Sequence, residues 1–202
     1  MRSPHALYQI KPLSCDPARL KGLSEKLIVS HYENNYGGAV KRLNAITEQL
    51  AALDFARAPV FTINGFKREE LIATNSMILH ELYFDGLGES RGSAGRAQRR
   101  PYARFWGHRA LASGVQCHGQ GAGRGFRLGA AGVFGARQQA RQPVGRRSYP
   151  CHLARGVPIL ALDMYEHSYH IDYGAKAAAY VDAFMQNINW ANVIRLYREC
   201  LS

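Results

Sequence analysis

Residues 163–173 read Asp-Met-Tyr-Glu-His-Ser-Tyr-His-Ile-Asp-Tyr, and they overlap the end of a continuous apolar run at Val157–Met164. A short apolar run that begins after a glycine, here Gly156, is typical of a buried strand. Asp163 and His167 stand four residues apart where this strand is expected to end. A strand end can present the carboxylate while the following turn brings the imidazole to the same side. This stretch therefore predicts a strand that carries two ligand-type side chains at its end.

A long helix is expected near the N-terminus, over residues 16–53. Asp16-Pro17 and Ser24 are both plausible starts for it. Gly37-Gly38 is expected to interrupt or bend the helix, or to let another segment approach closely. His31 then lies about half-way along this helix.

A second helix is expected over Lys67–Phe84, after a connection at Ala56–Asn64 and before a stop at Asp85–Gly88. Two helices joined by a short loop favour an antiparallel hairpin. Such a hairpin can bring His80 of the second helix close to His31 of the first.

The four residues His31, His80, Asp163 and His167 form a candidate metal site. Three neutral imidazoles and one carboxylate suit a redox-active first-row metal such as Fe or Mn. Each signal is weak on its own, because a single helical histidine is more often a core or surface residue than a ligand. Further helices are expected at Ala175–Ile188 and Trp190–Cys200.

The formal net charge of +11 comes from one segment, residues 91–152. This segment contains twelve Arg and twelve of the 20 Gly, but no Lys, Asp or Glu, so the rest of the chain carries −1. A Gly/Arg-rich segment can bind RNA through charge, or it can serve as a linker. A third interpretation is that the coding DNA is read in a shifted frame here.

The shifted frame explains the abnormal composition of about residues 90–153. Arg, Gly, Ala and Pro have GC-rich codons, whereas Ile and Asn, which are absent from residues 91–152, have AT-rich codons. Back-translation in the neighbouring frame permits a chain of balanced charge with helix-like and strand-like stretches. Sequencing of the coding DNA across codons 85–160 tests this interpretation.

The compartment is expected to be the cytoplasm. No apolar run approaches the roughly 18 residues of a membrane span, and Met1–Cys15 lacks the apolar core of a secretory signal. The four cysteines are scattered along the chain without the spacing of a disulfide framework: Cys15, Cys117, Cys151 and Cys200.

Taken in order, these motifs resemble the iron/manganese superoxide dismutases. The stretch 163–173 is similar to the family signature Asp-x-Trp-Glu-His-x-Tyr-x-x-Asp-Tyr, with Tyr165 in place of the tryptophan. His31-Tyr32, His80-Glu81-Leu82-Tyr83-Phe84 and Asn187-Ile188-Asn189-Trp190 are similar to other family motifs. The resemblance covers about residues 10–90 and 154–200.

The resemblance implies an α+β fold, in which an N-terminal antiparallel helical hairpin (residues 1–89) precedes a small α/β domain (residues 90–202). That second domain would have a short antiparallel sheet flanked by helices. Because about residues 90–153 are abnormal, we expect the sheet to be disrupted and the strand at Val157–Met164 to lack its neighbours.

The resemblance also implies a superoxide dismutase with one Fe or Mn ion per subunit, held by the four candidate ligands. Glu166 and His170 resemble residues that bridge the two sites of a homodimer. We expect no specific nucleic acid and no membrane among the partners, and activity impaired by the abnormal segment. The alternative is a non-enzymatic basic protein that binds nucleic acid through this segment.

Three positions depart from the family. The family usually carries a tyrosine eight residues and a histidine four residues after the first ligand, where this chain has Ala39 and Asn35. Ser76 stands where the iron form often has a glutamine. Tyr36 is a candidate to supply part of the missing hydroxyl function.

Overall fold

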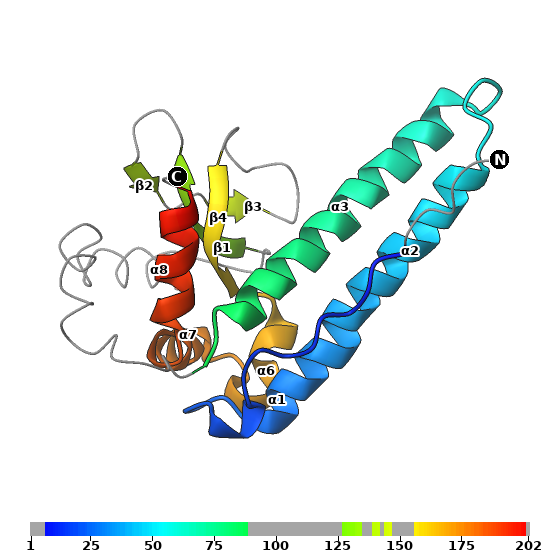
Figure 1. Ribbon diagram of the computed structural model, residues 1–202. Coiled ribbons are helices and arrows are strands. Elements are labelled where there is room, and N and C mark those ends of the chain that lie inside the picture. The colour runs from blue at the N-terminus through cyan, green and yellow to red at the C-terminus, as the bar shows by residue number, and fades with distance from the viewer. Residues whose placement is uncertain (1–6, 89–126, 135–138, 142–143, 147–155, 201–202) are drawn as a thin grey trace.

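The computed structural model describes residues 7–88, 127–134, 139–141, 144–146 and 156–200. Its N-terminal half is a long helical hairpin, and a sheet with further helices lies at one end of that hairpin (Figure 1). The described elements are η1 (Pro17–Arg19), α1 (Glu25–Ser30), η2 (His31–Tyr36), α2 (Gly37–Ala52), α3 (Val60–Asp85), β1 (Arg127–Phe134), β2 (Gln139–Arg141), β3 (Val144–Arg146), β4 (Gly156–Asp163), η3 (Glu166–Ser168), α6 (His170–Tyr173), α7 (Ala177–Gln186) and α8 (Trp190–Glu199).

The first long helix is built from α1, η2 and α2 in succession. Both predicted start signals form a cap, because Asp16 caps the short η1 and Ser24 caps α1 by accepting the Leu27 N–H at 3.1 Å. The predicted irregularity is real, but it is a π-helical segment, η2, that ends directly before Gly37-Gly38. The glycines themselves lie in regular α-helix, so the prediction of a glycine interruption was wrong in position.

The second helix, α3, begins earlier than expected. Pro59 occupies the N-cap position, and the helix runs from Val60 through Asn64-Gly65 to Asp85. The connection is therefore shorter than the predicted Ala56–Asn64. A glycine in an exposed helix interior costs only about 1 kcal/mol, which a helix of 26 residues can absorb.

The hairpin closes around a narrow apolar seam and ends at a glycine turn. α2 and α3 lie side by side and antiparallel (Figure 1), with Val40, Leu43 and Met77 among the buried residues. Gly86 ends α3, and Gly88 has a φ of +123°, a backbone region that favours glycine. The Gly88 N–H donates to the Asn187 carbonyl, which ties the end of the hairpin to the C-terminal helices.

β4 is paired along its length. The described sheet has the order β2-β1-β3, and β4 pairs antiparallel with β1 from Gly156↔Phe134 to Asp163↔Leu128. The expectation that this strand lacks neighbours was therefore wrong, since backbone pairing requires no particular side chains. The sheet is nevertheless irregular, because β2 and β3 span three residues each and the β1–β4 register shifts between Ala131 and Gly132.

The predicted C-terminal helices form α7, which is two residues shorter at each end than expected, and α8, which begins at the predicted residue and ends one residue early. α7 buries Tyr180 and Phe184 in the core that it shares with the hairpin. The α+β class, with an N-terminal helical hairpin, is confirmed. The division into residues 1–89 and 90–202 stays a prediction. In the described part of the chain, no helix is both long enough and apolar enough to cross a membrane.

Candidate metal centre

The hairpin supplies two imidazoles that face each other. His31 begins the π-helical segment η2 and is fully buried, while His80 lies in the last part of α3 and is 9 % exposed. Their ring centroids lie 5.1 Å apart. The antiparallel hairpin thus brings together two histidines that are 49 positions apart in the sequence, as predicted.

The end of β4 supplies the other two side chains. Asp163 is the last residue of the strand and is 3 % exposed, and His167 lies in the η3 turn that follows. The Tyr165 N–H donates to Asp163 Oδ1 at 2.8 Å, which turns the other carboxylate oxygen, Oδ2, toward the imidazoles. His167 Nε2 lies 3.2 Å from this Oδ2.

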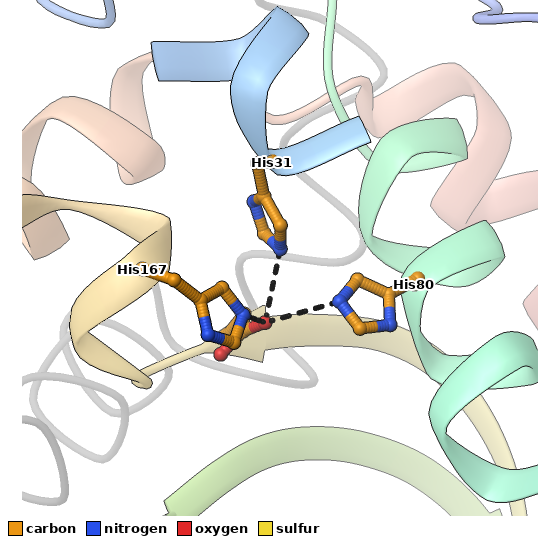
Figure 2. Close-up of side chains that lie close together, drawn as sticks. His31, His80 and His167 are labelled. Carbon is orange, nitrogen blue, oxygen red and sulfur yellow. Dashed lines mark hydrogen bonds and ion pairs between the residues drawn. The ribbon is translucent and has the colours of Figure 1, made fainter. Parts of the chain in front are cut away.

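The four donor atoms converge on one point. His31 Nε2 lies 3.2 Å and His80 Nε2 3.7 Å from Asp163 Oδ2. Figure 2 shows the imidazoles of His31, His80 and His167 directed toward one another from three elements. One ligand atom from each of the four residues lies within 4.8 Å of the others, a spacing that a single ion could occupy.

Burial sets the charge of these groups. It lowers the pKa of His80 to about 4 and also lowers the pKa of His31, so both imidazoles are neutral near pH 7. Burial alone would raise the pKa of Asp163, but hydrogen bonds with His167 and His31 outweigh it and hold this pKa below its usual range. A neutral imidazole and an ionised carboxylate are the forms that bind metal ions.

Two buried imidazole nitrogens, His31 Nδ1 and His80 Nε2, have no hydrogen-bond partner among the described residues, and of these His80 Nε2 is the one that belongs to the converging group. His80 Nδ1 lies 2.7 Å from the Ser76 carbonyl oxygen, which can only accept a proton, so Nδ1 carries the ring proton and Nε2 presents a lone pair. His80 Nε2 is buried and has no hydrogen-bond partner among the described residues. An unpaired buried lone pair is costly, and a metal ion at the convergence point would satisfy it. The donor set therefore fits a metal ion.

A cavity of about 400 Å³ opens beside the four residues. His80, Asp163 and His167 line this cavity, and so does Arg42. All three positions that depart from the family pattern, Asn35, Ala39 and Ser76, also line this cavity. The family's larger side chains at Ala39 and Ser76 are therefore replaced by small ones in the space next to the donors.

Tyr36 does not fill this space. Its hydroxyl accepts the Lys11 N–H at 2.9 Å and donates to Glu81 Oε1 at 3.1 Å. Tyr165, which replaces the signature tryptophan, does line the cavity and stacks on His167 with ring centroids 5.2 Å apart. An aromatic wall is thus kept at this position.

Glu166 begins the η3 turn and His170 begins α6, and both lie exposed on the surface. They are not part of the converging group. Their predicted part in a homodimer stays a prediction.

Three buried hydroxyls next to the donors were not singled out from the sequence: Ser168, Tyr83 and Tyr180. Tyr180 Oη lies 2.8 Å from the carbonyl oxygen of Asp163 and 3.3 Å from Tyr83 Oη. Tyr83 follows His80 by three residues on one helix, a spacing that places both on one face. The sequence holds no comparable signal for Tyr180.

Known superoxide dismutases are similar to this chain over most of its length. The chain is 58% identical over 187 residues to an iron superoxide dismutase of Cupriavidus metallidurans, an alignment that covers 91% of this chain and 93% of the relative. The chain belongs to the iron/manganese superoxide dismutase family. Residues 138–196 match the family described as "Iron/manganese superoxide dismutases, C-terminal domain".

Other members of the family differ in their metal. An iron superoxide dismutase of Aquifex aeolicus is 31% identical over 96% of this chain and 94% of its own length. A manganese superoxide dismutase of Haloferax volcanii is 27% identical over 96% of this chain and 97% of its own length. The resemblance noted from short motifs is thus confirmed over nearly the whole chain.

Proposed function

We propose that this protein is a superoxide dismutase that holds one Fe or Mn ion per subunit through His31, His80, Asp163 and His167. The observation that carries the proposal is the convergence of their four donor atoms in a chain of this family. A bound Fe or Mn ion supplies one-electron chemistry, which oxidises one superoxide to oxygen and reduces the next to hydrogen peroxide.

The protein's own residues hold and shield this chemistry. Asp163 contributes one negative charge, and two of the imidazoles are neutral, so the four donors carry less charge than a carboxylate-rich site would. Tyr83 and Phe84 pack against the His31 ring at centroid distances of 5.0 and 5.1 Å and keep water away from it.

The cavity beside the donors is the proposed approach for superoxide. Superoxide is a small anion, and Arg42 adds a positive charge to the cavity wall. Arg42 also pairs with Glu69, which orients the guanidinium.

The finer assignments are part of the same proposal. A homodimer is supported by the exposure of Glu166 and His170 beside the site, and a cytoplasmic location is supported by the scattered cysteines, of which Cys15 and Cys200 are free. Impaired activity, expected from the abnormal segment, is part of the same prediction. No comparison supports the alternative of a basic nucleic-acid-binding protein.

Metal analysis with two matched variants tests the proposal. The wild type, loaded with Fe or Mn, should bind the metal and dismutate superoxide with the reduced activity expected from the abnormal segment, whereas Asp163→Asn should lose most of both, because a neutral amide is a poor ligand at this site. Asp54→Asn, an exposed change in the hairpin loop, should leave both unchanged. A wild type that stays metal-free after loading with either metal would overturn the proposal.

A further inference from the structure

The hydroxyls of Tyr83 and Tyr180 form a connection between the two halves of the metal centre. Tyr83 belongs to α3, the helix that carries His80, and Tyr180 belongs to α7. Both side chains are fully buried. Their oxygens lie 3.3 Å apart, and Tyr180 Oη lies 2.8 Å from the carbonyl oxygen of Asp163 at the end of β4.

The direction of these hydrogen bonds follows from counting protons. The Asp163 carbonyl oxygen can only accept, so the Tyr180 hydroxyl must donate its one proton to it. The Tyr180 oxygen is then an acceptor for Tyr83, whose hydroxyl donates to it. The chain therefore runs in one direction, from α3 through α7 to β4.

Ser168 cannot replace Tyr180 as the donor. Its hydroxyl lies 2.7 Å from the Asp163 carbonyl oxygen and also 2.7 Å from the Tyr165 carbonyl oxygen. One hydroxyl proton is shared between these two acceptors, so Tyr180 is the dedicated donor to Asp163.

Aromatic packing fixes the two tyrosines in place. Tyr83 stacks on Phe184 with centroids 5.7 Å apart, and Tyr180 stacks on Tyr169 with centroids 5.2 Å apart. Neither ring can swing away without opening the core. The two hydrogen bonds that connect Tyr83, Tyr180 and the Asp163 carbonyl therefore hold α3, α7 and β4 at a fixed spacing. We call this connection the strut.

We infer that Tyr83 and Tyr180 are positioning residues that set the spacing between His80 and Asp163, so that the donor atoms of the hairpin and of the sheet meet at one ion. This inference rests on the proposed function for the identity of the ion, but the strut itself is a property of the metal-free chain. Tyr83 acts through Tyr180, and neither hydroxyl is one of the four converging ligand atoms.

Three phenylalanine variants test the inference: Tyr83→Phe, Tyr180→Phe and the double variant. Each removes hydroxyls while keeping the rings. The change of such an outer partner typically weakens metal binding by about tenfold or more, so we expect about a tenfold rise in the metal Kd for Tyr180→Phe, measured against a competing chelator. Since Tyr83 acts through Tyr180, the double variant should bind no more weakly than Tyr180→Phe alone.

The electronic symmetry of the bound ion separates positioning from mere stability. The zero-field splitting in the paramagnetic resonance spectrum should shift in Tyr180→Phe and stay at the wild-type value in Tyr173→Phe, the matched control, whose hydroxyl donates to the Gly22 carbonyl. If Tyr180→Phe fails to fold, Tyr83→Phe provides the same readouts from the other hydrogen bond of the strut.

Two outcomes would overturn the inference. One is a Tyr180→Phe protein with wild-type metal affinity and spectrum. The other is a double variant whose loss of metal affinity equals the sum of the losses in Tyr83→Phe and Tyr180→Phe. The coupling of the two tyrosines in the unfolding free energy of the metal-free protein tests the strut without any ion. Failure of the proposed function is a separate result, because it would appear as a wild type that binds no metal.

Discussion

Two small residues beside the four candidate metal ligands, Ala39 and Ser76, distinguish this chain from the family pattern. Ala39 is buried on α2, and Ser76 lies one helical turn before His80 on α3. Ser76 still holds His80, but through its main-chain carbonyl, a contact that does not depend on the side chain. The orientation of the imidazole is thus kept while the space beside it is left open.

Replacement of Ala39 by tyrosine should obstruct this space. In the metal-loaded protein, Ala39→Tyr should weaken the binding of azide, a small anion, by about 1 kcal/mol or roughly fivefold in Kd, because the new ring occupies the cavity next to the donors. An optical titration with azide measures this Kd. Ala52→Tyr, at the exposed end of the same helix, should leave it unchanged, and an equal azide Kd in both variants would contradict the cavity as the route to the donors.

The sequence reveals single residues better than it reveals their connections. All four converging residues were named from the sequence, because their order and local contexts resemble the family motifs, although each signal is weak on its own. The partners Tyr83 and Tyr180 are 97 positions apart. A contact between two tyrosines in separate helices leaves no local pattern, so only the structure could reveal it.

The start of the first helix connects the segment that carries His31 to the segment that follows His167. Ser24 caps α1, and its hydroxyl also donates to Asp172 Oδ1 at 2.6 Å, while its N–H donates to Oδ2 at 2.7 Å. The start of the helix that carries His31 is thereby fixed to α6, the helix that follows His167. Helix boundary and tertiary contact coincide in one residue.

Loss of this cap should destabilise the protein. Ser24→Ala should lower the free energy of unfolding by about 1–2 kcal/mol. The substitution removes the helix cap, and it also removes one of the two hydrogen bonds that Ser24 donates to the Asp172 carboxylate. Urea unfolding measures the change. Ser24→Thr keeps a hydroxyl and should retain most of the stability, whereas equal losses in both variants would show that the cap contributes nothing.

Element boundaries were predicted less well than element types. The start of α3 was placed late because Asn64-Gly65 is a common turn signal, whereas the chain continues through it as helix. The neighbours of β4 were missed because the segment that supplies β1 has a composition unlike that of a strand.

Buried tyrosines give the whole molecule a defined response to alkaline pH. Burial raises the pKa of Tyr36 to about 12 and raises the pKa values of Tyr83 and Tyr180 above their usual range. The ordinary pKa of a tyrosine is about 10. Between about pH 10 and pH 12 the unfolded chain loses the hydroxyl protons of these tyrosines, whereas the folded chain retains them. The contribution of the three tyrosines to the free energy of unfolding is therefore fully present below about pH 10 and is lost as the pH rises toward 12.

The free energy of unfolding should therefore fall steeply above pH 10. Each such tyrosine contributes up to about 1.4 kcal/mol per pH unit, and urea unfolding at a series of pH values between 9 and 11 measures the slope. The double variant Tyr83→Phe/Tyr180→Phe should show a shallower slope. A wild-type stability that does not change over this range would contradict the burial of these hydroxyls.

The π-helical segment at His31–Tyr36 has a consequence for how this chain can vary. A π turn holds one residue more than an α turn, so it behaves like a single-residue insertion kept inside a helix. Deletion of one residue between positions 32 and 35 would restore a regular helix and leave His31 close to its present orientation relative to the buried face of α2, because the wider turn already absorbs the extra residue. The segment can therefore lose its extra residue without turning His31 away, whereas the same deletion inside the regular helix α2 would rotate the residues on its two sides by about 100° relative to each other.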